Sequence, residues 1–216
     1  PLSADRFKFH NKPKPAPDDE PGWGVARGNQ MDFSFTEEQS MLRDTVASYL
    51  ADHYSFEQRR DALKAEPGWR PAVWKAFAEE LGILGAPFSE ELGGLGGGST
   101  DNMVIMEELG KALVVEPYLP TVVIGGGFLK HGKPAGADEL IGKIIAGEAI
   151  IAFAYAEPQG RYTWSDLKTT AKKDGAGYVL NGHKAVVIGA PYATHLIVTA
   201  RTGGGQREAQ GVSVFI

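Results

Sequence analysis

The stretch Gly147-Glu148-Ala149-Ile150-Ile151-Ala152-Phe153-Ala154-Tyr155 separates two parts of the chain whose apolar residues follow different periods. Before it, apolar residues recur at helical spacing, as Leu42, Val46 and Leu50 do. After it, short runs with strand character are separated by glycine-rich turns. Helices followed by strands are typical of α+β proteins. We therefore predict an α+β fold, in which an amino-terminal all-helical domain precedes an antiparallel β-barrel-like domain.

Capping residues and proline mark the helix boundaries of the first part. Thr36 and Gln39 form a capping-box pair, as do Ser55 and Gln58, because hydroxyl and amide side chains at this spacing each accept a backbone N–H of the first turn. Pro71 suits the first turn of a third helix, where its missing N–H costs nothing. Later helices are expected over residues 102–113, 122–129 and 138–146, with a glycine-rich loop over 93–98.

Two turn signals divide the second part into strands. Asp174-Gly175-Ala176-Gly177 predicts a hairpin between strands at residues 169–173 and 178–180. Asn181-Gly182 is typical of a two-residue hairpin turn, so residues 183–188 are expected to pair as its second strand. Further strands are expected at residues 149–155, 196–200 and 212–216.

The composition limits the classes of function. The 216 residues carry a formal charge of −5 and include no cysteine, so disulfides and thiolate metal sites cannot form. A mildly acidic chain does not show the basic stripe of nucleic-acid-binding proteins, so no nucleic-acid partner is expected. No apolar run approaches the ~20 residues of a membrane helix, and no secretory signal is visible. We expect a cytoplasmic protein without membrane insertion.

The first thirty residues differ from the rest. Lys12-Pro13-Lys14-Pro15-Ala16-Pro17 is followed by Asp18-Asp19-Glu20, a composition that resists folding. Residues 1–30 are therefore predicted to be a Pro-rich arm, non-native or disordered. A remnant of processing or expression and a ligand for another domain are the two interpretations.

The residue pattern alone assigns no reaction. The glycines from Gly93 to Gly98 match neither Gly-x-Gly-x-x-Gly nor a Walker loop, and a helix precedes them where those motifs need a strand. The five histidines have no ligand spacing, so no metal site is expected. Glu107-Glu108, at the end of a helical run, is typical of a solvated or cap-pairing face.

Several segments in order do suggest a family. Ile83-Leu84-Gly85-Ala86-Pro87, Glu90-Glu91-Leu92-Gly93-Gly94-Leu95-Gly96 and Glu107-Glu108-Leu109-Gly110 resemble the amino-terminal helical domain of acyl-CoA dehydrogenases. Ala152-Phe153-Ala154-Tyr155-Ala156-Glu157-Pro158, Thr169-Thr170-Ala171 and Leu180-Asn181-Gly182-His183-Lys184 are similar to segments of the family's middle β domain. The resemblance runs from Phe33 to Ile216.

The resemblance implies domains at residues 31–147 (helical) and 148–216 (middle β domain, truncated), with a carboxy-terminal helical domain absent from this chain. It implies FAD as cofactor, an acyl-CoA substrate, electron-transfer flavoprotein as acceptor, and α,β-desaturation with hydride transfer to the flavin. In most members a glutamate of the carboxy-terminal domain removes the α-proton. We therefore assign no catalytic residue in this chain, and neither Glu107 nor Glu157 is proposed as the catalytic base.

The same resemblance points to two cofactor-binding segments with substrate-binding residues between them. The cofactor segments are Phe153, Ala154, Tyr155 and Ala156, then Val186, Val187 and Ile188, and the substrate residues are Arg161 and Tyr162.

Departures from the family pattern lie within these segments. Ala156 and Ile188 stand where the family has hydroxyl residues that hydrogen-bond the flavin. Loss of these two hydrogen bonds would lower the affinity for FAD by ~10–100-fold, unless backbone N–H groups at the same positions hold the ring. Arg161 suits a pyrophosphate or CoA phosphate, or alternatively pairs with Glu157. Tyr162 replaces a family serine, where it either narrows the acyl-CoA entrance or is a surface aromatic.

This altered pattern resembles the small subunits of two-component acyl-CoA dehydrogenases, such as pimeloyl-CoA dehydrogenase, so a second acyl-CoA dehydrogenase subunit is an expected partner. Three hypotheses follow. The chain belongs to a flavoenzyme subunit, to a non-catalytic partner subunit, or to a related acyl-CoA oxidase or flavin monooxygenase.

Overall fold

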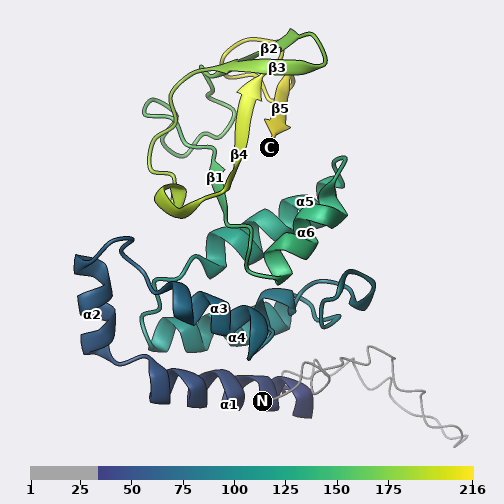
Figure 1. Ribbon diagram of the computed structural model, residues 1–216. Helices are drawn as coiled ribbons and strands as arrows, with labels where there is room; N and C mark the ends of the chain where they lie inside the picture. The colour runs from purple at the N-terminus through teal and green to yellow at the C-terminus, as the bar shows by residue number, and fades with distance from the viewer. Residues whose placement is uncertain (1–33) are drawn as a thin grey trace, which may run out of the picture.

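The computed structural model describes residues 34–216, so the arm predicted for residues 1–30 lies outside the described part of the chain. A group of helices lies below a twisted sheet (Figure 1), which confirms the predicted α+β order. Within residues 34–216, no helix combines the length and the apolar character needed to cross a membrane.

The first two helices carry both predicted capping boxes. Thr36 and Gln39 cap α1 (Glu37–His53), and Ser55 and Gln58 cap α2 (Phe56–Lys64). The remaining helical elements are α3 (Pro71–Glu79), the 3-10 turns η2 (Ile83–Gly85) and η3 (Glu90–Leu92), α4 (Ser99–Lys111), the π-helix η4 (Leu119–Gly125), α5 (Gly126–Gly132) and α6 (Ala137–Ile145).

One apolar core extends from the helices onto the first strand, β1 (Ile151–Ala154). Leu42 of α1, Phe77 of α3, Ile105 of α4 and Ile151 of β1 are all fully buried members of it. The sheet is therefore anchored on the helical core by burial of apolar surface, the largest favourable term in folding.

Two polar contacts between the helices and the β1 region fix the position of the strand. The Trp74 Nε1–H donates to the carbonyl oxygen of Gly147 at 3.0 Å. The fully buried Thr121 hydroxyl accepts from the Ile151 amide at 3.1 Å and donates to the Ile151 carbonyl at 3.4 Å. Both ends of the connection to β1 are thus held by the helices, which sets the path of the strand.

The helix expected over residues 122–129 is longer than predicted and takes two forms, because η4 runs directly into α5. A glycine pair at the junction allows close packing on both sides. A Cβ at Gly125 would lie 2.9 Å from the Ile151 Cβ, and one at Gly126 would lie 2.6 Å from the Phe88 Cζ. These glycines let the helix approach β1 and the Phe88 ring more closely than any other residue would allow.

The sheet is mixed and open, which corrects the predicted antiparallel β-barrel-like arrangement. The strand order is β1-β4-β2-β3, with β5 paired to β4. β1 and β4 are parallel, whereas β2–β3 and β4–β5 are antiparallel. A parallel pair needs a long crossover connection, which leaves no local turn signal in the sequence. The other strands are β2 (Thr170–Asp174), β3 (Gly177–Asn181), β4 (His195–Arg201) and β5 (Val212–Phe215).

The hairpin predicted at residues 174–177 is confirmed, because Asp174 pairs with Gly177 across its turn. The hairpin predicted at Asn181-Gly182 is wrong, because residues 183–188 form no strand. The chain instead crosses to residues 155–157. Gly182 allows the backbone to pass close to Thr169, since a Cβ at residue 182 would lie 2.6 Å from the Thr169 Cα.

Gly126→Ala is expected to lower the free energy of unfolding by about 1–3 kcal/mol, because its Cβ would press on the buried Phe88 ring. Urea denaturation measures the change. Gly127→Ala is the matched control, since a Cβ there meets nothing within 4 Å. Alanine is favoured over glycine in helices by ~1 kcal/mol, so the control should be neutral or stabilising. Equal losses in both variants would contradict the packing argument.

Candidate functional site

A cavity of about 360 Å³ lies at the end of β1, where the loop that follows the strand folds back beside it. Five of the residues predicted to bind cofactor or substrate line it: Phe153, Tyr155, Ala156, Arg161 and Tyr162. The rest of the wall consists of Glu157, Gly160, Thr163, Trp164 and Asp166. The structure therefore brings together residues of the first predicted cofactor segment and both predicted substrate residues.

A row of three aromatic rings leads from α5 to this cavity. The ring centroids of Phe128 and Phe153 are 4.6 Å apart. Phe153 and Tyr155, two residues apart and so on one face of the strand, stack with centroids 5.0 Å apart at an interplanar angle of 23°. Ala154 points to the other face and is buried. Tyr155, at the end of the row, is 43% exposed, and its ring gives the cavity lining a flat surface.

Ala185, the residue before the second predicted cofactor segment, donates its backbone N–H to the Ala156 carbonyl of the first segment at 2.9 Å. Val186 and Ile188 are 84% and 66% exposed, while Val187 is half-buried. None of these three lines the cavity. Val186 has φ +53°, a left-handed conformation that costs a β-branched residue energy and tends to persist at functional sites.

Glu157 connects three segments of the site, residues 157–159, residues 168–169 and Lys184. Its carboxylate accepts from the Lys168 amide at 2.7 Å, the Thr169 amide at 3.1 Å, the Gln159 side chain at 2.8 Å and the Lys184 Nζ at 2.9 Å. Lys184 also donates to the Tyr155 carbonyl at 3.3 Å. Since both charged side chains are almost fully buried, this ion pair is shielded from solvent.

The protonation state of Glu157 follows from these contacts. Burial alone would raise the pKa of its carboxyl group. The hydrogen bonds from Thr169, Gln159, Lys184 and Lys168 outweigh burial and lower the pKa from 4.5 to about 2. Glu157 is therefore an ionised structural anchor at neutral pH.

The structure decides one alternative for Arg161. Glu157 pairs with Lys184, and no ion pair joins Arg161 to any carboxylate among residues 34–216. Arg161 is exposed with φ +46°, and Tyr162 beside it is 100% exposed. Both side chains are thus available to a ligand, and their predicted substrate-binding roles stay predictions.

Lys184, Trp164 and Asp166 are among the residues of the site that sequence reasoning missed. Lys184 belongs to a segment that resembles the family, but a lysine that follows Asn-Gly gives no sign of its ion pair with the distant Glu157. Trp164 lines the cavity and is 80% exposed, but it belongs to no sequence motif. Asp166 lines it too and is buried, held by Gln206 at 2.6 Å and Arg207 at 2.8 Å. Its partners are about forty residues away, which sequence spacing cannot reveal.

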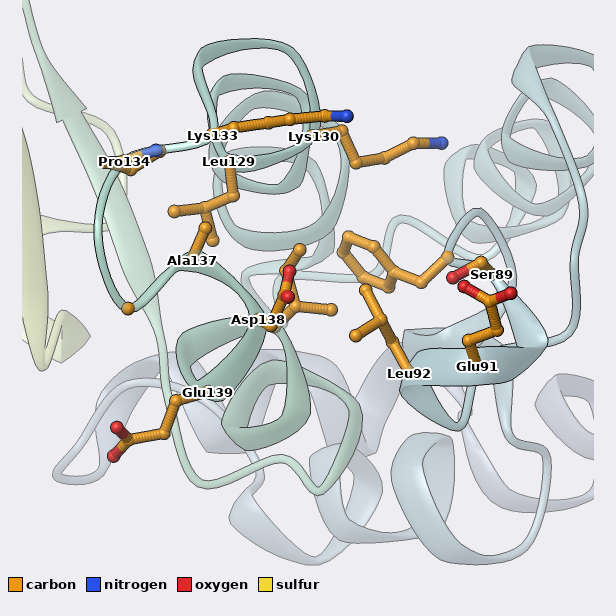
Figure 2. Close-up of a pocket in the computed structure, with 13 residues that line it drawn as sticks. Ser89, Glu91, Leu92, Leu129, Lys130, Lys133, Pro134, Ala137, Asp138 and Glu139 are labelled. Atoms are coloured by element: carbon orange, nitrogen blue, oxygen red, sulfur yellow. The ribbon is translucent and has the colours of Figure 1, made fainter.

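A second cavity, of about 600 Å³, lies in the helical part between η3, α5 and α6 (Figure 2). Phe88, Leu92 and Leu129 contribute apolar surface, while lysines and carboxylates surround it: Lys130, Lys133, Glu91, Asp138 and Glu139. None of the residues predicted to bind FAD or acyl-CoA lines it, so it is separate from the candidate site.

Acid should weaken the protein through Glu157. Because its folded-state pKa lies below the value of 4.5 for the free group, the unfolded chain takes up the proton first. The stabilisation is complete above pH 4.5 and is lost as the pH falls towards 2. Glu157→Gln should therefore show a smaller loss of unfolding free energy over this range than the wild type, measured by urea denaturation at each pH.

Glu139→Gln is the matched control for this titration. Glu139 pairs with Lys143 at 2.6 Å on an exposed helix face, where ion pairs contribute little. This variant should follow the wild-type pH profile closely. A Glu157→Gln profile with the wild-type slope would contradict the anchoring role.

Comparison with known proteins places this geometry in a family. Residues 36–148 match the family model "Acyl-CoA dehydrogenase, N-terminal domain", and residues 152–216 match "Acyl-CoA dehydrogenase, middle domain". Acyl-CoA dehydrogenase FadE29 of Mycobacterium tuberculosis is 29% identical over 188 residues, 86% of this chain and 48% of the relative. The chain thus spans about half the length of this curated relative.

Solved structures show the same likeness. The ChsE4-ChsE5 complex from Mycobacterium tuberculosis has a chain with a TM-score of 0.73 and 28% identity, covering 86% of this chain and 48% of that one. The FAD complex of PigA gives a TM-score of 0.71 and 25% identity, covering 86% and 49%. Members of the matched family are FAD-dependent. Because the two family models together cover most of its residues, this chain belongs to the acyl-CoA dehydrogenase family.

Proposed function

We propose that the chain forms part of an FAD-dependent acyl-CoA dehydrogenase subunit, which desaturates an acyl-CoA thioester between its α and β carbons. The observation that carries the proposal is the Ala185–Ala156 hydrogen bond, which brings the two segments expected to contact the flavin side by side. The domain division at residues 31–147 and 148–216 and the cytoplasmic location belong to the same proposal.

The residues present fit a flavin. The stacked rings of Phe153 and Tyr155 offer a flat surface of the kind on which aromatic ring systems pack. The exposed apolar side chains of Val186 and Ile188 lie beyond the Ala185–Ala156 contact and would be covered by such a ring. When bound, FAD supplies the acceptor for the substrate hydride.

The residues of this chain would bind and orient the ligands. The exposed guanidinium group of Arg161 is free to pair with a phosphate of FAD or CoA, and Tyr162 beside it would limit access to the cavity. Glu157 and Lys184 would hold the flavin-facing segments in place without exchanging protons. The catalytic base is proposed to come from the family's carboxy-terminal helical domain, which lies outside the matched residues.

A second subunit is part of the proposal. Neither Ala156 nor Ile188 has a hydroxyl group to hydrogen-bond the flavin, which favours a site completed by another acyl-CoA dehydrogenase subunit. The similarity to a chain of the ChsE4-ChsE5 complex supports an assembly of two unlike subunits. The same two residues favour the second candidate function, a non-catalytic subunit that supports an active partner. Electron-transfer flavoprotein is the proposed acceptor.

The visible absorption spectrum of the protein, expressed at the full length of its gene, tests the proposal. Flavin bands in the protein alone would support a flavoenzyme subunit. Bands only after co-expression with an acyl-CoA dehydrogenase partner would support a jointly built site. An absence of flavin in both preparations would contradict the proposal. Ile188→Thr, which restores one hydroxyl, should tighten FAD binding by about 2–10-fold.

A further inference from the structure

A buried arginine, Arg201 at the end of β4, lies behind the cavity wall and is 6% exposed. Its guanidinium group has no carboxylate within ion-pair distance among residues 34–216. It donates instead to six backbone carbonyls, at 2.6–3.4 Å, those of Ser165, Leu167, Gly203, Gln206, Glu208 and Gln210. A buried charge without a counterion is costly, so each of these carbonyls matters to the stability of the arrangement.

The six carbonyls belong to two separate loops. Ser165 and Leu167 flank Asp166, which lines the cavity. The other four lie in the 203–210 loop, between β4 and β5. The guanidinium group therefore ties the cavity wall to the 203–210 loop through a common centre.

Other hydrogen bonds join the same two loops. The Leu167 amide donates to the Gln206 carbonyl at 3.0 Å. The Asp166 carboxylate accepts from the Gln206 side chain at 2.6 Å and the Arg207 Nε at 2.8 Å. Arg207 is itself largely exposed, so its contact alone would hold the wall weakly.

Only arginine can make this arrangement. Its guanidinium group presents five N–H donors in one rigid plane, whereas a lysine ammonium group has three on a flexible stem. Arg201 uses Nε and both terminal nitrogens, and the Gln206 carbonyl accepts from two of them. Lysine would preserve the charge and leave part of the carbonyl set without a donor.

We propose that Arg201 is a positioning residue for the candidate site: it fixes the 163–167 wall of the cavity and so sets the affinity for FAD or acyl-CoA. The inference rests on the proposed function for the identity of the ligand. Its structural half, the fixing of the wall, does not depend on that function.

The first test is FAD affinity of the full-length protein, in complex with its partner where the complex is required. Arg201→Lys is expected to weaken FAD binding by about tenfold or more. Val46→Ala is the stability control, because Val46 is fully buried in α1, at the opposite end of the molecule from the sheet (Figure 1). Equal affinities in the two variants, at a similar loss of melting temperature, would overturn the ligand half of the proposal.

The second test measures the mobility of the 163–167 wall in the absence of any ligand. Hydrogen exchange of the Asp166 and Leu167 amides should speed up at least tenfold in Arg201→Lys and stay unchanged in Val46→Ala. Unchanged exchange in Arg201→Lys would overturn the proposal even if FAD binds. If the wild-type protein and its complex bind no FAD, the proposed function fails while the exchange result still decides the role of Arg201.

A further variant covers the case in which Arg201→Lys does not fold. Gln206→Ala removes the side-chain bond to Asp166 and keeps Arg201 in place. It should raise exchange at Asp166 and Leu167 by a smaller factor, about two- to fivefold. An increase of tenfold or more there would overturn the role of Arg201, because the Gln206 side chain would then be the contact that holds the wall.

Discussion

The buried ion pair between Glu157 and Lys184 is the contact on which the candidate site depends. Glu157 gathers two backbone amides, a side-chain amide and an ammonium group onto one carboxylate, so three stretches of chain (residues 157–159, residues 168–169 and Lys184) share a single centre. Taking both charges out of water is costly, and this cost is offset only while every hydrogen bond is made. The site geometry is therefore cooperative: loss of Lys184 would leave Glu157 as a buried charge without its counterion.

The helical part supplies the fixed frame for this centre. The glycine pair at residues 125–126 and the Thr121 hydroxyl hold β1 against the helical core, so the aromatic row of Phe128, Phe153 and Tyr155 runs from α5 to the cavity. On the far side, Arg201 holds the cavity wall by backbone carbonyls alone. The cavity is thus bordered by a strand fixed through packing and a loop fixed through hydrogen bonds.

Local rules predicted the parts of the fold that local contacts determine. The capping boxes at Thr36 and Ser55 and the hairpin at residues 174–177 each depend on residues a few positions apart. The parallel β1–β4 pair and the path after Asn181 depend on contacts between distant residues, and there the predictions were wrong. A favourable turn sequence did not form a hairpin because Lys184 and Ala185 bind the segment at 155–157 instead.

The site shows the same division. Resemblance to a family indicated the segments around Phe153 and Val187, and alternation along a strand accounts for Phe153 and Tyr155 sharing a face. Nothing in the sequence marks Arg201, because its acceptors are backbone carbonyls, which every residue has. Arg161 is a charged departure from the family pattern and is exposed, whereas the buried charges of Glu157, Lys184 and Arg201 hold the segments of the site together.

Hydrogen exchange of Lys184→Met tests the central claim most directly. If the Glu157–Lys184 pair holds the two segments together, the amides of Ala185, Lys168 and Thr169 should exchange at least tenfold faster than in the wild type. Amides of α1, which do not contact the pair, should keep their protection. Wild-type protection at Ala185, Lys168 and Thr169 in this variant would contradict the account, because the segments would then be held by something other than the ion pair.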